Sequence, residues 1–348
     1  MYKTLGYAAM NPTSPLVAFT FERRELKDHD VLIEIDYCGV CHSDIHQVKN
    51  EWGRSLYPMV PGHEIVGHIT KTGKGVSKFT IGDLAGVGCL VDSCRKCLNC
   101  QDNLEQFCVN GSVGTYNSVE KDGVTRTFGG YSQSIVVDEQ FVLKIPINLD
   151  LSKVAPLLCA GITTYSPLRF WKVGPGQNIA VLGLGGLGHM AVKFAHSFGA
   201  HVSVLTHSKN KEEDAFKLGA DKVIFVGNKE DNFEQYAHSF DLILDTVSAA
   251  HDINLYLPLL KREGKMVLVG LPETPPTIAP GNLIFGRKIL TGSLIGGIAE
   301  TQEMLDYCGI HNITSEVEVI APQKINEAFE RMLKGDVKYR FVLDMKAL

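Results

Sequence analysis

The stretch Asn178-Ile179-Ala180-Val181-Leu182-Gly183-Leu184-Gly185-Gly186-Leu187-Gly188 decides the fold of this chain. Its first five residues are typical of a buried strand, and G-x-G-x-x-G follows them directly and opens a helical run. In that context Gly183 permits a tight turn, Gly185 lets the backbone approach a pyrophosphate, and Gly188 allows close packing of helix on strand. Amide groups at the helix N-terminus, around Gly186 and Leu187, would bind phosphate oxygens. The alternative is a glycine-rich turn without a ligand.

Strands and helices alternate around this motif. Alternation of this kind predicts a doubly wound parallel sheet with helices on both faces, an α/β nucleotide-binding (Rossmann) domain over residues 151–287. The expected strands are 178–182, 201–206, 222–226, 241–246 and 265–270, and the expected helices are 187–198, 209–218 and 250–262.

Both ends of the chain differ from this pattern. Residues 31–37 and 65–70 are strand-like and are separated by Gly- and Pro-rich turns, which favours a mostly β region. After Arg287 short strands return, with two amphipathic helices near 300–309 and 325–334. We therefore expect one catalytic domain, built from residues 1–150 and 288–348, which the nucleotide-binding domain interrupts.

The end of the second predicted strand indicates the choice of cofactor. An NAD enzyme places Asp or Glu there to bind the ribose 2′-hydroxyl. Here the strand ends at Thr206, and no carboxylate occurs before Glu212. Hydroxyl and cationic side chains in this loop favour NADP through its 2′-phosphate. The candidates are Thr206, His207, Ser208 and Lys211, with Lys209 as a further possibility; a solvated basic loop is the alternative.

Cys94, Cys97, Cys100 and Cys108 form the pattern C-x2-C-x2-C-x7-C. Each C-x2-C step aims two thiolates at one point, and a fourth sulfur completes a tetrahedron around Zn²⁺. The flanking residues are polar and have no core of their own, so that a metal is needed to order them. Two disulfides or idle thiols are the alternative. The spacing predicts a closed structural zinc site.

A second group of possible ligands lies outside this lobe. Cys38, Cys41, His42, Asp44 and His46 fall within nine residues of one another. Further along, His63-Glu64 joins an imidazole to a carboxylate, and Cys159 lies in an apolar segment. Such groups can form a Cys/His/Cys site with one open position, as catalytic zinc requires.

Composition excludes several classes of protein. The chain has 348 residues, 45% hydrophobic content and a formal net charge of −5, which gives no basis for a nucleic-acid or membrane partner. Met1–Pro12 lacks a basic start followed by an apolar core, so we expect no signal peptide. Nine cysteines without a secretion signal fit a reducing compartment, and we expect a cytoplasmic protein.

Longer phrases resemble one family closely. Gly62-His63-Glu64-x2-Gly67-x5-Gly73-x2-Val76 fits the zinc signature of the medium-chain alcohol dehydrogenases. Gly39-Val40-Cys41-His42-Ser43-Asp44 and Tyr57-Pro58-Met59-Val60-Pro61 resemble the cinnamyl alcohol dehydrogenase group within it. The similarity extends from about residue 3 to Met345. It implies a GroES-like catalytic domain beside the nucleotide-binding domain, two Zn²⁺ per chain, NADP(H) and a homodimer.

The resemblance also implies roles for single residues. Cys41, His63 and Cys159 would bind catalytic zinc, and Glu64 could approach the metal. Asp44 would orient His63, Ser43 would contact the alcohol oxygen, and His46 would carry the proton to solvent. His42 and Arg340 would reach the cofactor pyrophosphate. Thr163, Gly270 and Ile295 complete the expected cofactor site, and Trp52, Leu56 and Tyr116 the expected substrate pocket. Cys38, Cys89 and Cys308 would be buried apolar residues without a metal.

These residues predict an NADP-dependent zinc alcohol dehydrogenase that interconverts aromatic or aliphatic aldehydes and primary alcohols by hydride transfer. The nearest alternative is an NAD-dependent zinc alcohol or polyol dehydrogenase of the same superfamily. A zinc-free quinone reductase would lack both metal clusters. A zinc-ribbon scaffold that binds nucleic acid would need a basic stripe, which is missing.

Overall fold

The structure, a computed structural model, describes residues 1–226, 233–272 and 274–348. The chain forms two compact units: unit 1 comprises Met1–Ile162 and Ile295–Leu348, and unit 2 comprises Thr163–Leu294. The sequence predicts 151–287 for the inserted domain, whereas unit 2 begins 12 residues later and ends seven residues later. Unit 2 is an insertion in the chain of unit 1.

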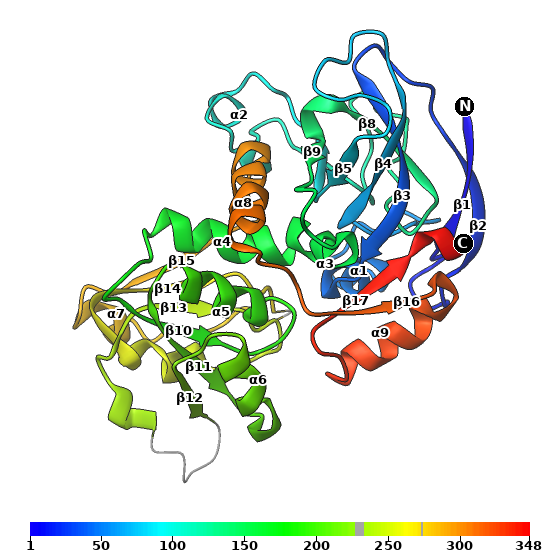
Figure 1. Cartoon of the computed structure of the whole chain (residues 1–348). Coiled ribbons are helices and arrows are strands. Elements are labelled where there is room, and N and C mark those ends of the chain that lie inside the picture. The colour runs from blue at the N-terminus through cyan, green and yellow to red at the C-terminus, as the bar shows by residue number, and fades with distance from the viewer. Residues whose placement is uncertain (227–232, 273) are drawn as a thin grey trace. The chain divides into compact units, whose positions relative to one another are not determined.

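Unit 2 contains a six-stranded parallel sheet in the order β12-β11-β10-β13-β14-β15. Counted from β10, this is the strand order 3-2-1-4-5-6 of dinucleotide-binding domains, with the switch point between β10 and β13. The predicted fold class is confirmed. The strands are β10 Asn178–Leu182, β11 His201–Thr206, β12 Lys222–Phe225, β13 Phe240–Asp245, β14 Leu260–Leu268 and β15 Ile289–Gly292 (Figure 1).

Helices and 3-10 turns connect these strands. The helices are α5 Gly188–Ser197, α6 Glu212–Lys217 and α7 Gly281–Ile284, with the 3-10 turns η4 Lys209–Lys211 and η5 Phe233–Tyr236. The helix expected over 250–262 is wrong. Two short 3-10 turns, η6 (Ile253–Leu255) and η7 (Leu257–Leu259), stand there, and Leu260 already begins β14. Pro258 lacks an N–H and therefore disfavours a continuous α-helix across this segment.

Unit 1 is built mainly on a seven-stranded sheet in the order β16-β17-β3-β4-β5-β9, with β8 also paired to β3. Two smaller sheets pair β1 with β2 and β6 with β7. The strands are β1 Tyr2–Ala8, β2 Val17–Arg23, β3 Asp30–Gly39, β4 Ile65–Thr72, β5 Leu84–Val87, β6 Leu90–Asp92, β7 Val113–Gly114, β8 Ser134–Asp138, β9 Leu143–Lys144, β16 Val317–Ile320 and β17 Arg340–Asp344 (Figure 1).

Helices in this part of the chain are mostly short. They are α1 His42–Val48, α2 Leu98–Gln101, α3 Leu151–Val154, α8 Ile298–His311 and α9 Ile325–Leu333; α4 Ala160–Phe170 begins in unit 1 and continues in unit 2. The 3-10 turns are η1 Glu105–Phe107, η2 Glu139–Phe141, η3 Ala155–Leu158, η8 Pro322–Lys324 and η9 Met345–Ala347.

Each unit has its own hydrophobic core. In unit 1, α9 buries Ile325, Ala328, Phe329 and Met332, spaced as one helical face, against β-strand residues such as Phe341. In unit 2, Leu182, Leu205 and Ile243 contribute to the core below the glycine-rich turn. Within the described parts of the chain, we find no helix with the length and apolarity that a membrane span requires.

Candidate metal centres and dinucleotide site

Four buried side chains of unit 1 converge on one point: Cys41, His63, Glu64 and Cys159. One possible ligand atom from each lies within 4.8 Å of all the others, and the two sulfurs are 4.0 Å apart. Ligands at Zn–S distances of about 2.3 Å in a tetrahedron place two sulfurs about 3.8 Å apart. The donor set and its spacing therefore fit Zn²⁺.

The four side chains reach this point from separate elements. Cys41 precedes α1, His63 and Glu64 precede β4, and Cys159 lies between η3 and α4. Gly39 makes room for the carboxylate, because a Cβ atom at that position would lie 1.9 Å from Glu64 Oε2. Chain segments more than a hundred residues apart are thus needed to complete the cluster.

Asp44 positions residues of the cluster through hydrogen bonds. It is fully buried, and its carboxylate oxygens accept hydrogen bonds from the backbone amides of Cys41 (2.9 Å) and Gly62 (3.2 Å) and from Tyr131 Oη (2.9 Å). Its Oδ1 lies 3.1 Å from His63 Nδ1. This contact fixes the tautomer of His63 and leaves Nε2 for a metal, the usual arrangement of a ligating histidine.

Glu64 has a buried cationic partner. Arg340 Nη2, on β17, donates a hydrogen bond to Glu64 Oε1, and both side chains are almost fully enclosed. Burial raises the pKa of the Glu64 carboxyl to about 8, and the positive charge of Arg340 opposes this rise. Glu64 Oε2 has no hydrogen-bond partner among the described residues. This orphaned oxygen beside two thiols fits a site built for a cation.

The two residues expected to carry a proton lie on α1, and the partners of His46 follow this helix. Ser43 Oγ is 3.6 Å from Cys41 Sγ. His46 Nδ1 hydrogen-bonds Glu51 Oε2, and its ring stacks on Trp52 with centroids 4.9 Å apart. His46 Nε2 is buried and has no partner within the described chain. One nitrogen of His46 is thus anchored, and the other has no partner among the described residues.

Two of the three expected pocket residues, Trp52 and Tyr116, contact these groups. Trp52 and Leu56 are each 37% exposed, and Leu56 N donates to Asn117 Oδ1 at 2.8 Å. Tyr116 is buried and stacks on the His63 ring at 5.8 Å between centroids. Tyr116 therefore borders the metal cluster itself, and its contact with a substrate stays a prediction.

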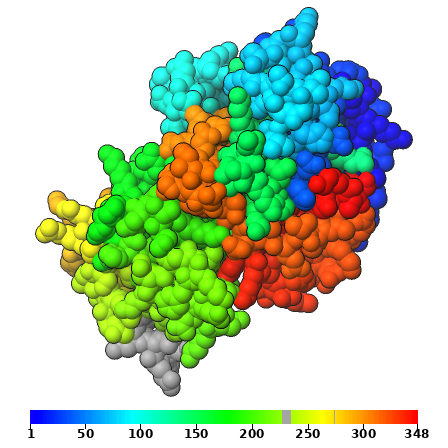
Figure 2. Space-filling model, viewed as in Figure 1, coloured from blue at the N-terminus to red at the C-terminus, as the bar shows by residue number. Residues whose placement is uncertain are grey.

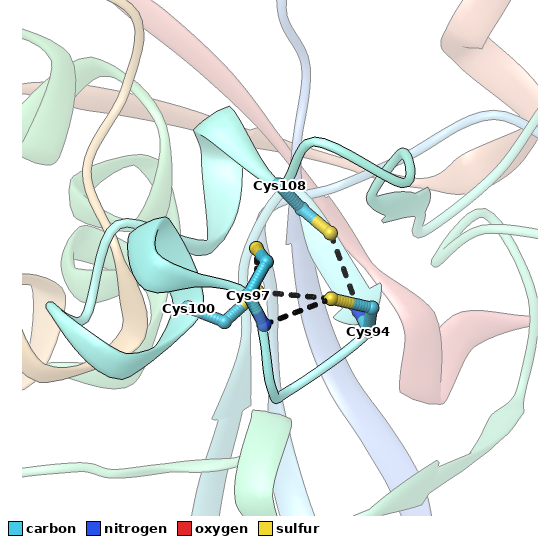
Figure 3. Close-up of side chains that lie close together, drawn as sticks. All are labelled: Cys94, Cys97, Cys100 and Cys108. Atoms are coloured by element: carbon cyan, nitrogen blue, oxygen red, sulfur yellow. Dashed lines mark hydrogen bonds between the residues drawn. The ribbon is translucent and has the colours of Figure 1, made fainter.

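The second cluster is the cysteine lobe between β6 and β7. Cys94, Cys97, Cys100 and Cys108 point toward one another (Figure 3) and satisfy the same distance limit. The sulfur of Cys100 lies 3.9 Å from that of Cys94 and 3.5 Å from that of Cys97. The amides of Lys96 and Cys97 and the Asn110 side chain stabilise the thiolate of Cys94 and lower its pKa to about 5. Four sulfurs with no other donor fit a closed structural Zn²⁺ site.

The lobe is fastened to the rest of unit 1 by polar contacts. Arg95 bonds Asp92 and Asp138, each at 2.9 Å. Glu105 Oε2 accepts the amide of Ile298, at the start of α8, at 3.0 Å. In Figure 2 the cyan surface of the lobe accordingly adjoins the orange surface of α8. The lobe is an ordered surface feature that contacts one helix N-terminus.

We predict that Cys100→Ser lowers the zinc content from two to one per chain and the melting temperature by at least about 5 °C, because a lobe without a core loses its cross-link. Metal analysis and thermal unfolding measure both. Cys308→Ala is the control, since Cys308 is buried away from both clusters. A Cys100→Ser protein with two zincs and an unchanged melting temperature would contradict the assignment.

The glycine motif of unit 2 has the expected geometry. Gly183, directly after β10, has φ +86°, and a Cβ atom at Gly188 would lie 2.1 Å from Gly183 O. A Cβ atom at Gly185 would meet nothing within 4 Å. The backbone at Gly185 is thus open to a ligand, while Gly188 allows α5 to pack closely on the turn. This cradle fits the pyrophosphate of a dinucleotide.

The loop after β11 lies beside this motif. Lys211 Nζ donates to Leu184 O at 2.9 Å, so that the cation is held against the glycine-rich turn. Ser208 N donates to Thr206 Oγ1 at 3.1 Å, Thr206 is buried and His207 is exposed. The predicted hydroxyl and cationic groups therefore gather at the carboxyl end of β11, where an NAD enzyme would have its carboxylate.

The other expected cofactor residues are distributed over both units. Gly270 follows β14 and packs on Val247, since a Cβ atom there would lie 2.2 Å from Val247 O. His42 is exposed at the start of α1. Thr163 is buried in α4, and Ile295, with φ +36°, is the residue at which the chain re-enters unit 1. Their contacts with a cofactor stay predictions.

Sequence reasoning missed Glu51 and Tyr131 and expected Cys89 to be a buried apolar residue. Glu51 and Tyr131 anchor His46 and Asp44, respectively. Cys89 is half-buried rather than fully buried, and a contact with the Cys159 thiol lowers its pKa. A carboxylate five residues after His46 was a weak signal for Glu51. Nothing in the sequence links Tyr131 to Asp44, because 87 residues separate them.

Comparison with known proteins agrees with this geometry. The profile of the alcohol dehydrogenase GroES-like domain matches residues 27–147, and that of the zinc-binding dehydrogenase domain matches residues 186–308. An NADP-dependent alcohol dehydrogenase C of Mycolicibacterium smegmatis is 55% identical over 344 residues, which cover 99% of this chain and 98% of that protein. The aldehyde reductase YahK of Escherichia coli is 53% identical over 351 residues, or 99% of both.

A solved structure is similar over the same length of chain. The cinnamyl alcohol dehydrogenase of Sorghum bicolor superposes with a TM-score of 0.96 at 44% identity and covers 99% of this chain and 98% of its own. The chain therefore belongs to the zinc-dependent medium-chain alcohol dehydrogenases, and within that family to the cinnamyl alcohol dehydrogenase group. The family predicted from the sequence is confirmed, and the protein is an oxidoreductase.

Proposed function

We propose that this protein interconverts aldehydes and primary alcohols with NADP(H) and zinc. The observation that carries the proposal is the convergence of Cys41, His63 and Cys159 with the orphaned Glu64 oxygen in unit 1. The donor set provides three protein ligands of a catalytic zinc and leaves a position for substrate or water. Relatives named as NADP-dependent alcohol dehydrogenase and aldehyde reductase support the same reaction class.

Each residue has a task in this proposal. Cys41, His63 and Cys159 hold the metal, and Asp44 keeps the His63 ring in the tautomer that leaves Nε2 unprotonated. When bound, zinc polarises the aldehyde oxygen and the reduced nicotinamide supplies hydride. The carboxylate of Glu64 stays paired with Arg340 and faces the cluster with its second oxygen.

Proton transfer falls to α1 and the turn after it. Ser43 lies beside Cys41 and is placed to give a proton to the alcohol oxygen. His46 would replenish that proton through its unpartnered Nε2, while Glu51 fixes the ring through Nδ1. Trp52 stacks on His46, so that an aromatic wall borders the path. Aromatic and aliphatic aldehydes match such a wall better than polyols do.

We predict that the zinc-loaded protein oxidises NADPH in the presence of cinnamaldehyde, and that Cys159→Ala lowers kcat about a thousandfold, because the aldehyde oxygen is no longer polarised. Metal analysis should show one zinc left per chain. Cys308→Ala is the control and should keep both metals and the rate. Full activity of Cys159→Ala, with two zincs bound, would contradict the proposed site.

NADP rather than NAD is proposed because Thr206, Ser208 and Lys211 surround the carboxyl end of β11. We predict that Thr206→Asp shifts selectivity toward NAD by roughly a hundredfold, since a carboxylate there repels the 2′-phosphate and binds the ribose hydroxyl. The measurement is kcat/KM for NADPH and NADH with one aldehyde. Lys222→Asp at the start of β12, which makes the charge of the next strand more negative by an even larger step (from +1 to −1), serves as the control for charge alone. An unchanged ratio in Thr206→Asp would place the 2′-phosphate elsewhere.

We infer a homodimer joined along β15. This strand is the last in the order of the unit 2 sheet, and four large apolar residues near it are exposed: Ile284, Phe285, Ile289 and Leu294. An exposed apolar strand edge is a template for pairing with another chain. A two-fold axis would let the β15 edges of two copies pair and bury each other's apolar residues. None of the nine cysteines forms a disulfide, and we infer a reducing, cytoplasmic location.

We predict that Phe285→Glu converts the dimer into a monomer, because Phe285 is 94% exposed and a carboxylate in its place cannot be buried in a partner. Sedimentation velocity at micromolar concentration measures this. Phe216→Glu is the matched control, since Phe216 is 48% exposed on α6 of the same unit. A dimeric Phe285→Glu protein, or a monomeric parent, would refute the inferred interface.

A further inference from the structure

A loop at the carboxyl end of β13 forms a wall of the glycine-rich turn. Thr246 Oγ1 donates to Leu182 O at 2.8 Å, and a Cβ atom at Gly183 would lie 2.9 Å from Val247 Cγ2. Val247 O also lies against Gly270. The loop 245–251 therefore touches two glycine positions of the dinucleotide site. A shift of this loop changes the surroundings of both.

Asp245 anchors the loop. Its backbone oxygen accepts the amides of Val269 (3.0 Å) and Gly270 (3.2 Å). Its buried carboxylate accepts Val247 N at 3.0 Å through Oδ1 and the His251 ring at 2.9 Å through Oδ2. One residue thus ties the end of β13 to the end of β14 and to both ends of the loop.

His251 is held between two acceptors. Nε2 faces the Asp245 carboxylate, and Nδ1 faces the carbonyl oxygen of Ala249 at 2.9 Å. Both ring nitrogens must carry hydrogen to donate both bonds, and a neutral imidazole carries only one. The two acceptors therefore favour the imidazolium, in which both ring nitrogens donate. The hydrogen bond to Asp245 raises the pKa of His251, against the opposing effect of partial burial.

The other groups around the ring do not alter this assignment. Asp252, on the same loop, adds negative charge, and Tyr256, from the turn after η6, packs edge-on against the ring at 6.1 Å between centroids. Burial raises the pKa of Tyr256, and the nearby negative charge of Asp245 adds to this rise. The Tyr256 hydroxyl therefore stays neutral at physiological pH. Two acids and one neutral phenol face the imidazole, which favours its charged form.

We propose that His251 is a positioning residue for NADP(H): its imidazolium holds the loop 245–251 against the glycine-rich turn, so that cofactor affinity depends on its protonation. This inference rests on the proposed function. The folded-state pKa is raised above the unfolded value, so the stabilisation is complete below about pH 6.5 and is lost as pH rises through the raised pKa. A cofactor that requires the ordered loop binds more weakly as this proton leaves.

The test compares NADPH binding by the zinc-loaded wild type, His251→Gln and the control His201→Gln. Fluorescence titration from pH 6 to pH 10 gives the dissociation constants without turnover. His201 is exposed at the amino end of β11, whereas the loop 245–251 follows the carboxyl end of β13 in the same parallel sheet. At pH 6.5 we expect His251→Gln to bind NADPH about tenfold more weakly than wild type, with the difference narrowing as pH rises. His201→Gln should match wild type throughout.

Separate measurement of KM and kcat distinguishes a positioning role of His251 from a general loss of folded protein. His251→Gln should raise KM for NADPH and leave kcat at saturating NADPH within about twofold, because His251 is assigned no contact with the reacting atoms. Asp245→Asn, which keeps an acceptor but removes the charge, should show the same reduced pH dependence and gives the same test if His251→Gln does not fold. Wild-type affinity of a folded variant across the whole pH range would overturn the inference. Failure of the wild type itself to bind NADPH would instead overturn the proposed function.

Discussion

The structure of unit 1 depends on the burial of several acidic groups around one point. Cys41, Cys159, Glu64 and Asp44 can each carry a negative charge there, and Arg340 is the buried cation paired with one of them. Uncompensated charges of this kind are costly away from water, and a divalent cation is often the largest local charge in such a site. Zinc would offset two of these charges and draw the thiols together. The sheet that brings β3, β4 and β17 side by side supplies the positions from which these groups meet.

The dinucleotide site of unit 2 depends instead on backbone shape. The switch point between β10 and β13 leaves room for the turn at Gly183, and Thr246 and Val247 pack against that turn from the next strand. No side chain at Gly185 or Gly188 could improve the cradle, because the first position must stay open and the second must stay small. At the margins of the cradle, Lys211 and His251 each hold a loop against the glycine motif.

Most of the fold followed from local patterns in the sequence. Strands β10 and β11 have the bounds expected from the sequence, and the glycine motif follows β10 as expected. Apolar runs and glycine spacing determine such features because they depend on residues close together in the chain. Two 3-10 turns replace the expected helix at 250–262, and Pro258 in the second of them disfavours a continuous α-helix. The four-cysteine site of the lobe was also predicted from local spacing, because its cysteines lie close together in the sequence. In contrast, the pairing of Glu64 with Arg340, 276 residues away, and of Asp44 with Tyr131 depends on the tertiary fold, which spacing alone does not reveal.

The two metal clusters use the same chemistry for different ends, and their surroundings explain the difference. In the lobe, backbone amides of Cys94 and Cys97 donate to sulfurs, and four thiols leave no place for another ligand. In the buried cluster, a histidine replaces one thiol, and the fourth group, Glu64, is held back by Arg340 rather than by the cluster itself. Because Glu64 pairs with Arg340, its carboxylate can leave the fourth ligand position to substrate or water. The closed site therefore suits a fixed cross-link, and the other suits a metal that must admit substrate.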